Sequence, residues 1–145
     1  MRAPRLRPAR GQRGRGRGRD AGSADAGLSV PTEEATLLAS DGAAVDLLGW
    51  SVALSADGSR ALVGAHGDDT AGGADAGSAR VFGRSGATWT EEAALLASNG
   101  AAGDELGVSV ALSPDGSRAL VGADEDDTAG GANAGSARVF TLPAP

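Results

Sequence analysis

The chain has no cysteine and no tyrosine, and only four aromatic side chains, two Trp and two Phe, among its 145 residues. It also lacks lysine and isoleucine, so its cationic side chains are arginines and its bulky aliphatic ones are mainly leucine and valine. Without cysteine there is neither a disulfide framework nor a thiolate metal site, and the compartment stays open. Because alanine supplies much of the 41% hydrophobic content, a compact core would be thinly filled, and we expect it to need a partner.

Long apolar runs are missing as well. Uninterrupted apolar stretches of only a few residues exclude a transmembrane helix, so we expect no membrane insertion. The arginine-rich start is not followed by the apolar segment of a secretory signal, so we expect no signal peptide in this chain. The length leaves room for one small domain at most.

Charge divides the chain into two dissimilar parts. Residues 1–19 carry eight Arg and no acidic residue, whereas residues 20–145 carry five Arg and all 19 acidic residues, a net charge of −14. The Arg-Gly run predicts a disordered basic tail and linker over residues 1–27. Such tails resemble nucleic-acid-binding segments, in which closely spaced guanidinium groups displace counterions from phosphate. The residues that would do so are Arg13, Arg15, Arg17 and Arg19.

This tail has no aromatic side chain that would stack on bases. A start site placed too far upstream, or simple-repeat DNA read as protein, would produce the same string. Association with nucleic acid through the tail therefore stands as the alternative function of the chain.

A repeat of 58 residues organises the acidic part. Residues 32–82 align with residues 90–140 without a gap, and 42 of the 51 columns are identical. The nine differing columns are Thr36/Ala94, Asp41/Asn99, Val45/Gly103, Leu47/Glu105, Trp50/Val108, Ala56/Pro114, His66/Asp124, Gly67/Glu125 and Asp75/Asn133. A fixed period indicates a repeat architecture, whose units bury their apolar faces against one another.

Each copy has the residue pattern of short β-strands. In the second copy we expect strands over residues 89–97, 108–112, 118–122 and 136–140. The sequence Ser-Pro-Asp-Gly-Ser at residues 113–117 predicts a tight hairpin, because glycine accepts the positive φ that such turns require. The absence of a 3.6-residue period favours small antiparallel sheets over helices.

Four strands per copy predict an all-β protein with two four-stranded antiparallel blades of the β-propeller type, at residues 28–88 and 89–145. A β-solenoid and a sandwich of two hairpin pairs stay open as alternatives. Propellers have about four to eight blades, so two repeats make an incomplete propeller, and we expect further blades or self-association. We expect Phe82 to fill the space between the two blades and Phe140 to face the place of a third.

Several motifs occur in the same order in both copies. In the second copy they are Trp89-Thr90-Glu91-Glu92, Ala97-Ser98-Asn99-Gly100-Ala101-Ala102-Gly103-Asp104-Glu105-Leu106-Gly107, Val121-Gly122-Ala123 and Gly135-Ser136-Ala137-Arg138-Val139-Phe140. Together they resemble the FG-GAP repeat, the blade unit of integrin-alpha-like β-propellers, in the form found in tandem arrays of microbial surface and secreted proteins. The departures are Leu48 and Leu106 for the Phe of "FG", His66 and Asp124 for the Pro of "GAP", and Arg80 and Arg138 for an aromatic before Val-Phe.

The resemblance implies a non-catalytic binding or adhesion module, part of a larger propeller or surface protein, with a protein or carbohydrate ligand. It also implies an extracellular or cell-surface location. The residues agree with the lack of catalysis, because cysteine is absent, the only histidine is His66, and no G-x-S-x-G elbow is present. We therefore expect no enzyme activity.

Integrin-like members of the resembled family bind Ca²⁺ through a loop similar to D-x-D-x-D-G-x-x-D. Here only Asp57 remains of that loop, with Arg60 three residues further on, and a Ca²⁺ site needs about six to eight oxygen ligands. We expect Asp57 and its counterpart Asp115 to act in turn formation. No cofactor is expected, and Ca²⁺ is the alternative.

A second acidic cluster is the better metal candidate. In an antiparallel meander, the loops after the first and third strands emerge at one sheet edge, which would place Asp41 and Asp46 near Asp68, Asp69 and Asp75. The candidate ligands are Asp68, Asp69, Asp124, Asp126 and Asp127. The alternative is a solvated acidic rim that keeps the array soluble.

Overall fold

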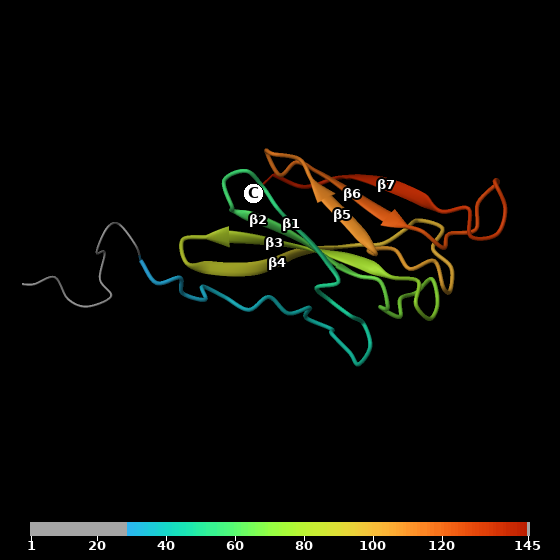
Figure 1. Cartoon of the computed structure of the whole chain (residues 1–145), viewed down its shortest axis with the longest axis horizontal. Coiled ribbons are helices and arrows are strands. Elements are labelled where there is room, and N and C mark those ends of the chain that lie inside the picture. The colour runs from blue at the N-terminus through green and yellow to red at the C-terminus, as the bar shows by residue number, and fades with distance from the viewer. Residues whose placement is uncertain (1–28, 145) are drawn as a thin grey trace, which may run out of the picture. The chain divides into compact units, whose positions relative to one another are not determined.

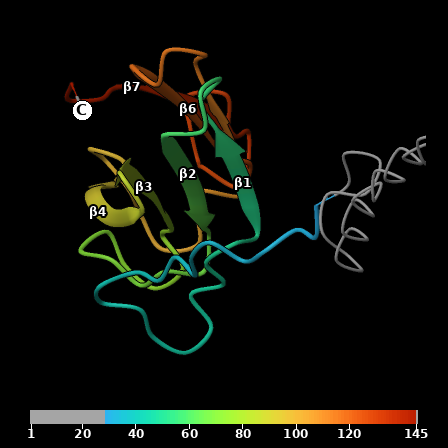
Figure 2. The same ribbon diagram turned by 90° about the vertical axis from the view of Figure 1, so that its left-hand side faces the viewer.

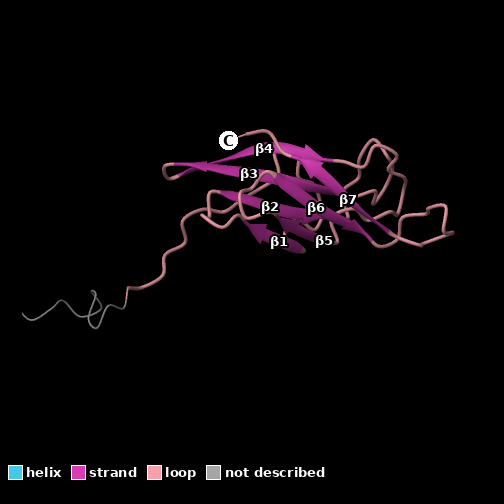
Figure 3. Ribbon diagram, turned by 90° about the horizontal axis from the view of Figure 1, so that it is seen from above, coloured by secondary structure: helices cyan, strands magenta, loops and turns pink. Residues whose placement is uncertain are grey.

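The computed structural model describes residues 29–144, which form strands, turns and loops without a helix (Figures 1 and 3). Their strands make two antiparallel sheets, one of four strands in the order β1-β2-β3-β4 and one of three in the order β5-β6-β7. The strands are β1 (Ser51–Leu54), β2 (Arg60–Ala65), β3 (Ser78–Ser85), β4 (Thr88–Leu95), β5 (Ser109–Leu112), β6 (Arg118–Ala123) and β7 (Ser136–Thr141). The predicted all-β class is confirmed.

The tight hairpins predicted at the Asp-Gly pairs are also confirmed. Gly58 adopts a φ of 71°, the left-handed region that favours glycine. One carboxylate oxygen of Asp57 accepts bonds from the Ser59 backbone N–H (3.0 Å), Ser59 Oγ (2.7 Å) and Ser55 Oγ (2.9 Å). Asp115 accepts the same set of bonds in the second copy. The aspartate bonds within these turns are local, so they form alike in both copies.

The strand expected over residues 89–97 belongs to the first sheet and not to the second. β4 pairs with β3 through a short turn at Gly86, whose φ is 61°. A hairpin of this kind places β4 beside β3 directly, which wins over pairing across the longer loop that leads to β5. The second sheet consequently has three strands, so the expectation of four strands in that blade is wrong. The segment of the first copy that matches β4, residues 30–37, forms no strand.

The two sheets pack face to face, as Figures 1 and 2 show. Leu62 and Val81 of the first sheet are fully buried in the shared core. Val121 of the second sheet lies in the same core, as does Leu106 from the loop before β5. Burial of these aliphatic side chains is the main favourable contribution to the packing of one sheet on the other.

The opposite face of the first sheet carries a second cluster around Phe82. This side chain packs with Ala61 and Val63, and it is covered by side chains of Leu37, Leu48 and Trp89. Our expectation that Phe82 fills the space between the sheets is therefore wrong. Phe140 packs against the core between the sheets instead. Phe82 and Phe140 have the same register in their sheets, opposite Ala61 and Ala119. Their surroundings differ because the face of the second sheet that carries Phe140 packs on the Leu62 face of the first sheet, and Phe82 lies on the other face.

Loops of the two copies are joined at one end of the sheets. Three backbone N–H groups of the segment before β5 donate to three carbonyls of the loop between β2 and β3. The pairs are Gly103 to Ala74 (2.9 Å), Glu105 to Asp75 (3.0 Å) and Leu106 to Ala76 (3.0 Å). Gly77 lies so close to Leu106 that a Cβ at this position would collide with its backbone. This contact fixes how the second copy is placed on the first.

Residues 29–33 form a unit apart from residues 34–144, and they are exposed and without regular structure. No helix of the described residues is long and apolar enough to cross a membrane.

Candidate functional site

The acidic loop of each copy holds one buried carboxylate. Asp68 accepts hydrogen bonds from Ser78 Oγ (2.6 Å) and from an Arg80 Nη (2.9 Å). Asp126 accepts the corresponding two bonds from its own serine and arginine, at 2.5 and 2.8 Å. Each of these carboxylates is thus neutralised and held by β3 or β7. One carboxylate oxygen of each of these two metal candidates, Asp68 and Asp126, is therefore engaged within the fold.

Arg80 is the centre of a larger ion-pair network. Its guanidinium contacts Asp41 (2.8 Å) and Glu91 (3.0 Å) in addition to Asp68. Burial acts to lower the pKa of Arg80, but the hydrogen bonds that it donates to Asp68, Asp41 and Glu91 outweigh burial and raise the pKa above its ordinary value. For Glu91, burial acts to raise the pKa, and bonds from Ser40 and Arg80 overcome it. The prediction that Asp41 lies near Asp68 is confirmed, with Arg80 between them.

The other acidic candidates take part in loop geometry or face solvent. Asp69 accepts the backbone N–H of Asp75 (2.9 Å), and Asp127 accepts that of Asn133 (2.7 Å). Asp124 is exposed. Among residues 29–144, no group of three or more His, Cys, Asp or Glu side chains converges as a metal site would require. Metal binding at these positions remains a prediction.

A different cluster gathers several positions at which the two copies differ. Trp50 packs its ring against His66, with the ring centroids 4.6 Å apart and the planes at 68°. His66 Nδ1 lies 3.5 Å from a carboxylate oxygen of Glu105. The second copy has Val108 and Asp124 in place of the first two residues. We call Trp50, His66 and Glu105 the divergent patch.

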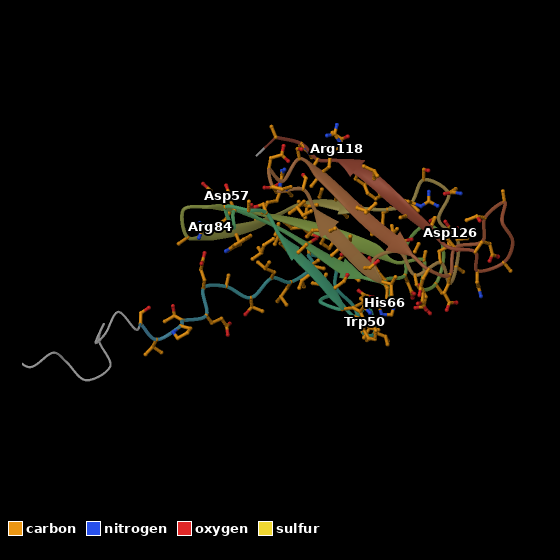
Figure 4. The ribbon with its side chains drawn as sticks, turned by 45° about the horizontal axis from the view of Figure 1, so that its top comes forward. Trp50, Asp57, His66, Arg84, Arg118 and Asp126 are labelled. Carbon is orange, nitrogen blue, oxygen red and sulfur yellow. The ribbon has the colours of Figure 1, made fainter. Side chains whose placement is uncertain are left out.

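The divergent patch combines an exposed aromatic with buried polar atoms. Trp50 keeps 62% of its surface exposed, whereas both ring nitrogens of His66 are buried without a hydrogen-bond partner among the described residues. Figure 4 shows the Trp50 and His66 side chains together, on the side of the molecule away from Arg118. An exposed indole beside a carboxylate offers a ligand an apolar face and a polar anchor at once.

A separate depression of about 290 Å³ is lined in part by Arg80, and no residue of the divergent patch is among its lining residues. Its lining includes Leu47, Leu48 and Ala65, which are neighbours of Trp50 and His66 in the chain, and its polar wall is formed by Asp46, Asp68 and Arg80. Apolar walls with a few placed polar groups are the usual composition of ligand sites.

Sequence reasoning did not find the divergent patch. Its signal was present in the columns Trp50/Val108, His66/Asp124 and Leu47/Glu105, but the three side chains meet only after the second copy packs on the first. The alternative nucleic-acid residues, Arg13, Arg15, Arg17 and Arg19, lie outside the described residues.

Two stacked antiparallel sheets, the first completed by a strand of the second copy and both joined by paired loops, define a β-propeller-type repeat module. A sequence model of the FG-GAP repeat family matches residues 31–82 and 89–140, so the chain belongs to this family. FG-GAP repeats are a non-enzymatic repeat family. A comparison with curated proteins finds no match.

Proposed function

We propose that the chain is a non-catalytic binding or adhesion module that holds its ligand at the divergent patch. The observation that supports this most is Trp50, a large aromatic left 62% exposed at a position where the second copy has valine. In a repeat with 42 identical columns of 51, a change that exposes an indole serves neither the strands nor the core between the sheets. Because the chain belongs to the FG-GAP family, we extend the proposal to a surface or secreted protein with a protein or carbohydrate ligand.

The chemistry of the patch suits either ligand class. A tryptophan that loses its water on binding is among the strongest anchors of protein interfaces, and truncating one costs about 2 kcal/mol or more. A sugar ring presents an apolar face that stacks on the indole while its hydroxyls donate to Glu105.

Binding assays on the full chain test this proposal. Immobilised oligosaccharides form one arm and purified extracellular matrix proteins form the other, with Trp50→Ala and Val108→Ala as the matched pair. We expect binding in at least one arm that Trp50→Ala weakens at least about tenfold and Val108→Ala leaves unchanged. Equal binding by both variants would exclude the patch. Salt-sensitive binding to RNA that survives Trp50→Ala would favour the tail instead.

A further inference from the structure

The outer face of the second sheet has the sequence of a buried face. Leu62 is 0% exposed in the first sheet, while Leu120, its equivalent in the second, is 45% exposed. Val81 is likewise 0% exposed and its equivalent Val139 is 67% exposed. A depression of about 260 Å³ lies on this outer face between these two side chains. The apolar residues are the ones that the first sheet uses to hold a neighbour.

β7 also has an unpaired edge among the described residues. In the first sheet the equivalent edge of β3 is covered by β4, whose Ala93 and Leu95 pair with Val81 and Ala79. Residues 34–37 read Glu-Ala-Thr-Leu and match residues 92–95 of β4, Glu-Ala-Ala-Leu. Yet residues 34–37 form no strand in the structure. Among the described residues, β7 is therefore an edge strand, while residues 34–37 have the sequence of a strand such as β4 and do not form one.

The arginines that begin β2 and β6 also differ in their contacts. Arg60 is buried, donates to the carbonyl of Gly116 (2.8 Å) and pairs with Glu92 of β4 (Nε to Oε2, 3.1 Å). Arg118, its equivalent, is exposed and points away from the sheets (Figure 4). Its guanidinium has no partner among residues 29–144. Glu34, the equivalent of Glu92, lies at the surface beside Arg84.

Each of the two loops that join the copies has an equivalent loop in the other copy. The carbonyls of Ala132, Asn133 and Ala134 are the equivalents of the three acceptors in the first copy. The N–H groups of Val45, Leu47 and Leu48 are the equivalents of the three donors in the second copy. Within the described residues, none of these six groups takes part in a backbone hydrogen bond of the kind that joins the copies. Donors and acceptors thus remain in matching sets at opposite ends.

The donor loop keeps its shape although none of its three N–H groups has a backbone partner of this kind among residues 29–144. Val45 has a φ of 70° and Leu47 a φ of 59°, close to the 81° of Gly103 and the 57° of Glu105. A left-handed conformation is unfavourable for a β-branched residue such as valine. Retaining it preserves the backbone geometry with which the second copy docks on the first.

We propose that a second molecule of this protein docks on the outer face of the second sheet, which we call the tail face. It docks through the outer face of its own first sheet, the head face, so the contact is head-to-tail. Residues 34–37 of the second molecule add to β7 as the missing fourth strand, and its Glu34 pairs with Arg118. Val52 and Leu54, which are exposed here, pack on Leu120 and Val139 as Val110 and Leu112 pack on the first sheet. The contact is heterologous, so repeated docking produces a closed ring or an open filament.

The proposed contact lacks two interactions of its template. The Ala56 N–H donates to the carbonyl of Pro114 (2.9 Å) between the copies, and Pro114, the equivalent of Ala56, has no N–H to donate in turn. The contact of His66 with Glu105 is lost as well, because Asp124 of one molecule faces Leu47 of the other at the equivalent positions. The docking between chains is therefore weaker than the docking within one, and it depends on concentration.

Sedimentation velocity of the full chain over a micromolar concentration series tests the proposal. We expect association that Leu120→Lys, on the tail face, and Val52→Lys, on the head face, each weaken at least about tenfold, because each buries an unpaired charge. Ala87→Lys, at the exposed tip of the hairpin between β3 and β4, is the control and associates as the parent does.

An equimolar mixture of the two variants is the decisive experiment. One variant keeps an intact head and the other an intact tail, so the mixture forms a dimer with one of each and grows no further. A parent chain that stays monomeric throughout the series contradicts the proposal. So does association that Leu120→Lys abolishes and Val52→Lys does not, which would mean that two tail faces meet. Circular dichroism of each variant, unchanged from the parent, separates lost docking from lost folding.

Discussion

The two sheets present the same sequence in two environments. Both contain the strand Arg-Ala-Leu-Val-Gly-Ala followed by the strand Ser-Ala-Arg-Val-Phe. All six residues of this first strand are buried in β2, but exposed residues alternate with covered ones in β6. Because the side chains are identical, the difference comes from what lies against each face. Burial in a repeat protein is a property of the neighbour as much as of the residue.

The largest contrast is expected at the central leucines. Leu62→Ala removes a fully buried side chain and should lower the free energy of unfolding by about 3 kcal/mol, whereas Leu120→Ala should cost less than about 1 kcal/mol. Urea denaturation at a protein concentration low enough to keep the chain monomeric measures both. Equal losses would mean that Leu120 is covered in solution even in the monomer.

The arginine pair should show a smaller contrast of the same sign. Arg60→Ala removes bonds to a carbonyl and to Glu92 and leaves that carboxylate partly buried, so we expect a loss of about 2 kcal/mol. Arg118→Ala should change stability by no more than about 0.5 kcal/mol. Denaturation in high salt serves as the control, since an enclosed pair is screened less than a surface one. A large salt-dependent loss for Arg118→Ala would contradict the comparison.

In contrast to the leucine and arginine pairs, the hairpin aspartates should contribute equally to the stability of the two copies. Bonds from Ser59 and Ser55 lower the pKa of Asp57 to about 2, and bonds from Ser117 and Ser113 lower that of Asp115 to about 2. A carboxyl whose pKa is depressed by folding contributes stability above its unfolded pKa of 3.8, and this contribution is lost as the pH falls through about 2. Asp57→Asn and Asp115→Asn should therefore lower the urea midpoint equally at neutral pH and have a much smaller effect at pH near 2. Unequal shifts would show that contacts between the copies, such as that of Arg60 with Gly116, alter the aspartate bonds.

The smallest difference is expected between divalent cations. Millimolar Ca²⁺ should raise Tm no more than Mg²⁺ does, because the buried carboxylates of both copies already bind Ser and Arg and the rest is general screening. Calorimetry in each chloride salt at matched ionic strength measures this. Tight, Ca²⁺-selective binding near one ion per copy would restore the metal-site hypothesis.

Local chemistry explains which parts of the fold the sequence predicts. The Asp-Gly turns and the strands flanking them depend on bonds within about ten residues, so Asp57 and Gly58 are where the pattern places them. Whether Phe82 lies between the sheets depends on which face of the first sheet packs on the second. The pairing of β4 depends on competition between two possible sheets. Neither is written in the alternation of a single strand.

The site shows the same limit. The approach of Asp41 to Asp68 was predicted from strand direction. In the structure the segment before Asp41 forms no strand, and Arg80 joins the two carboxylates. Arg80, which joins them, was recognised only as a departure from a family pattern, because its burial requires β4 and the loop before β1 to close over it. The contact of His66 with Glu105 spans the two copies, and no reading of one copy alone contains it.

The pairing of β4 with β3 also bears on how such a chain can lengthen. The period of the sequence is 58 residues, but the first sheet spans the end of one copy and the start of the next, because β4 aligns with residues that precede β1. A duplication of one period inserts three strands equivalent to β1, β2 and β3. It also inserts one strand equivalent to β4, which completes a neighbouring sheet. Each inserted copy therefore restores the junction it interrupts, wherever within the period the recombination falls. Copy number can change by unequal crossing-over while the sheets on either side keep their strands.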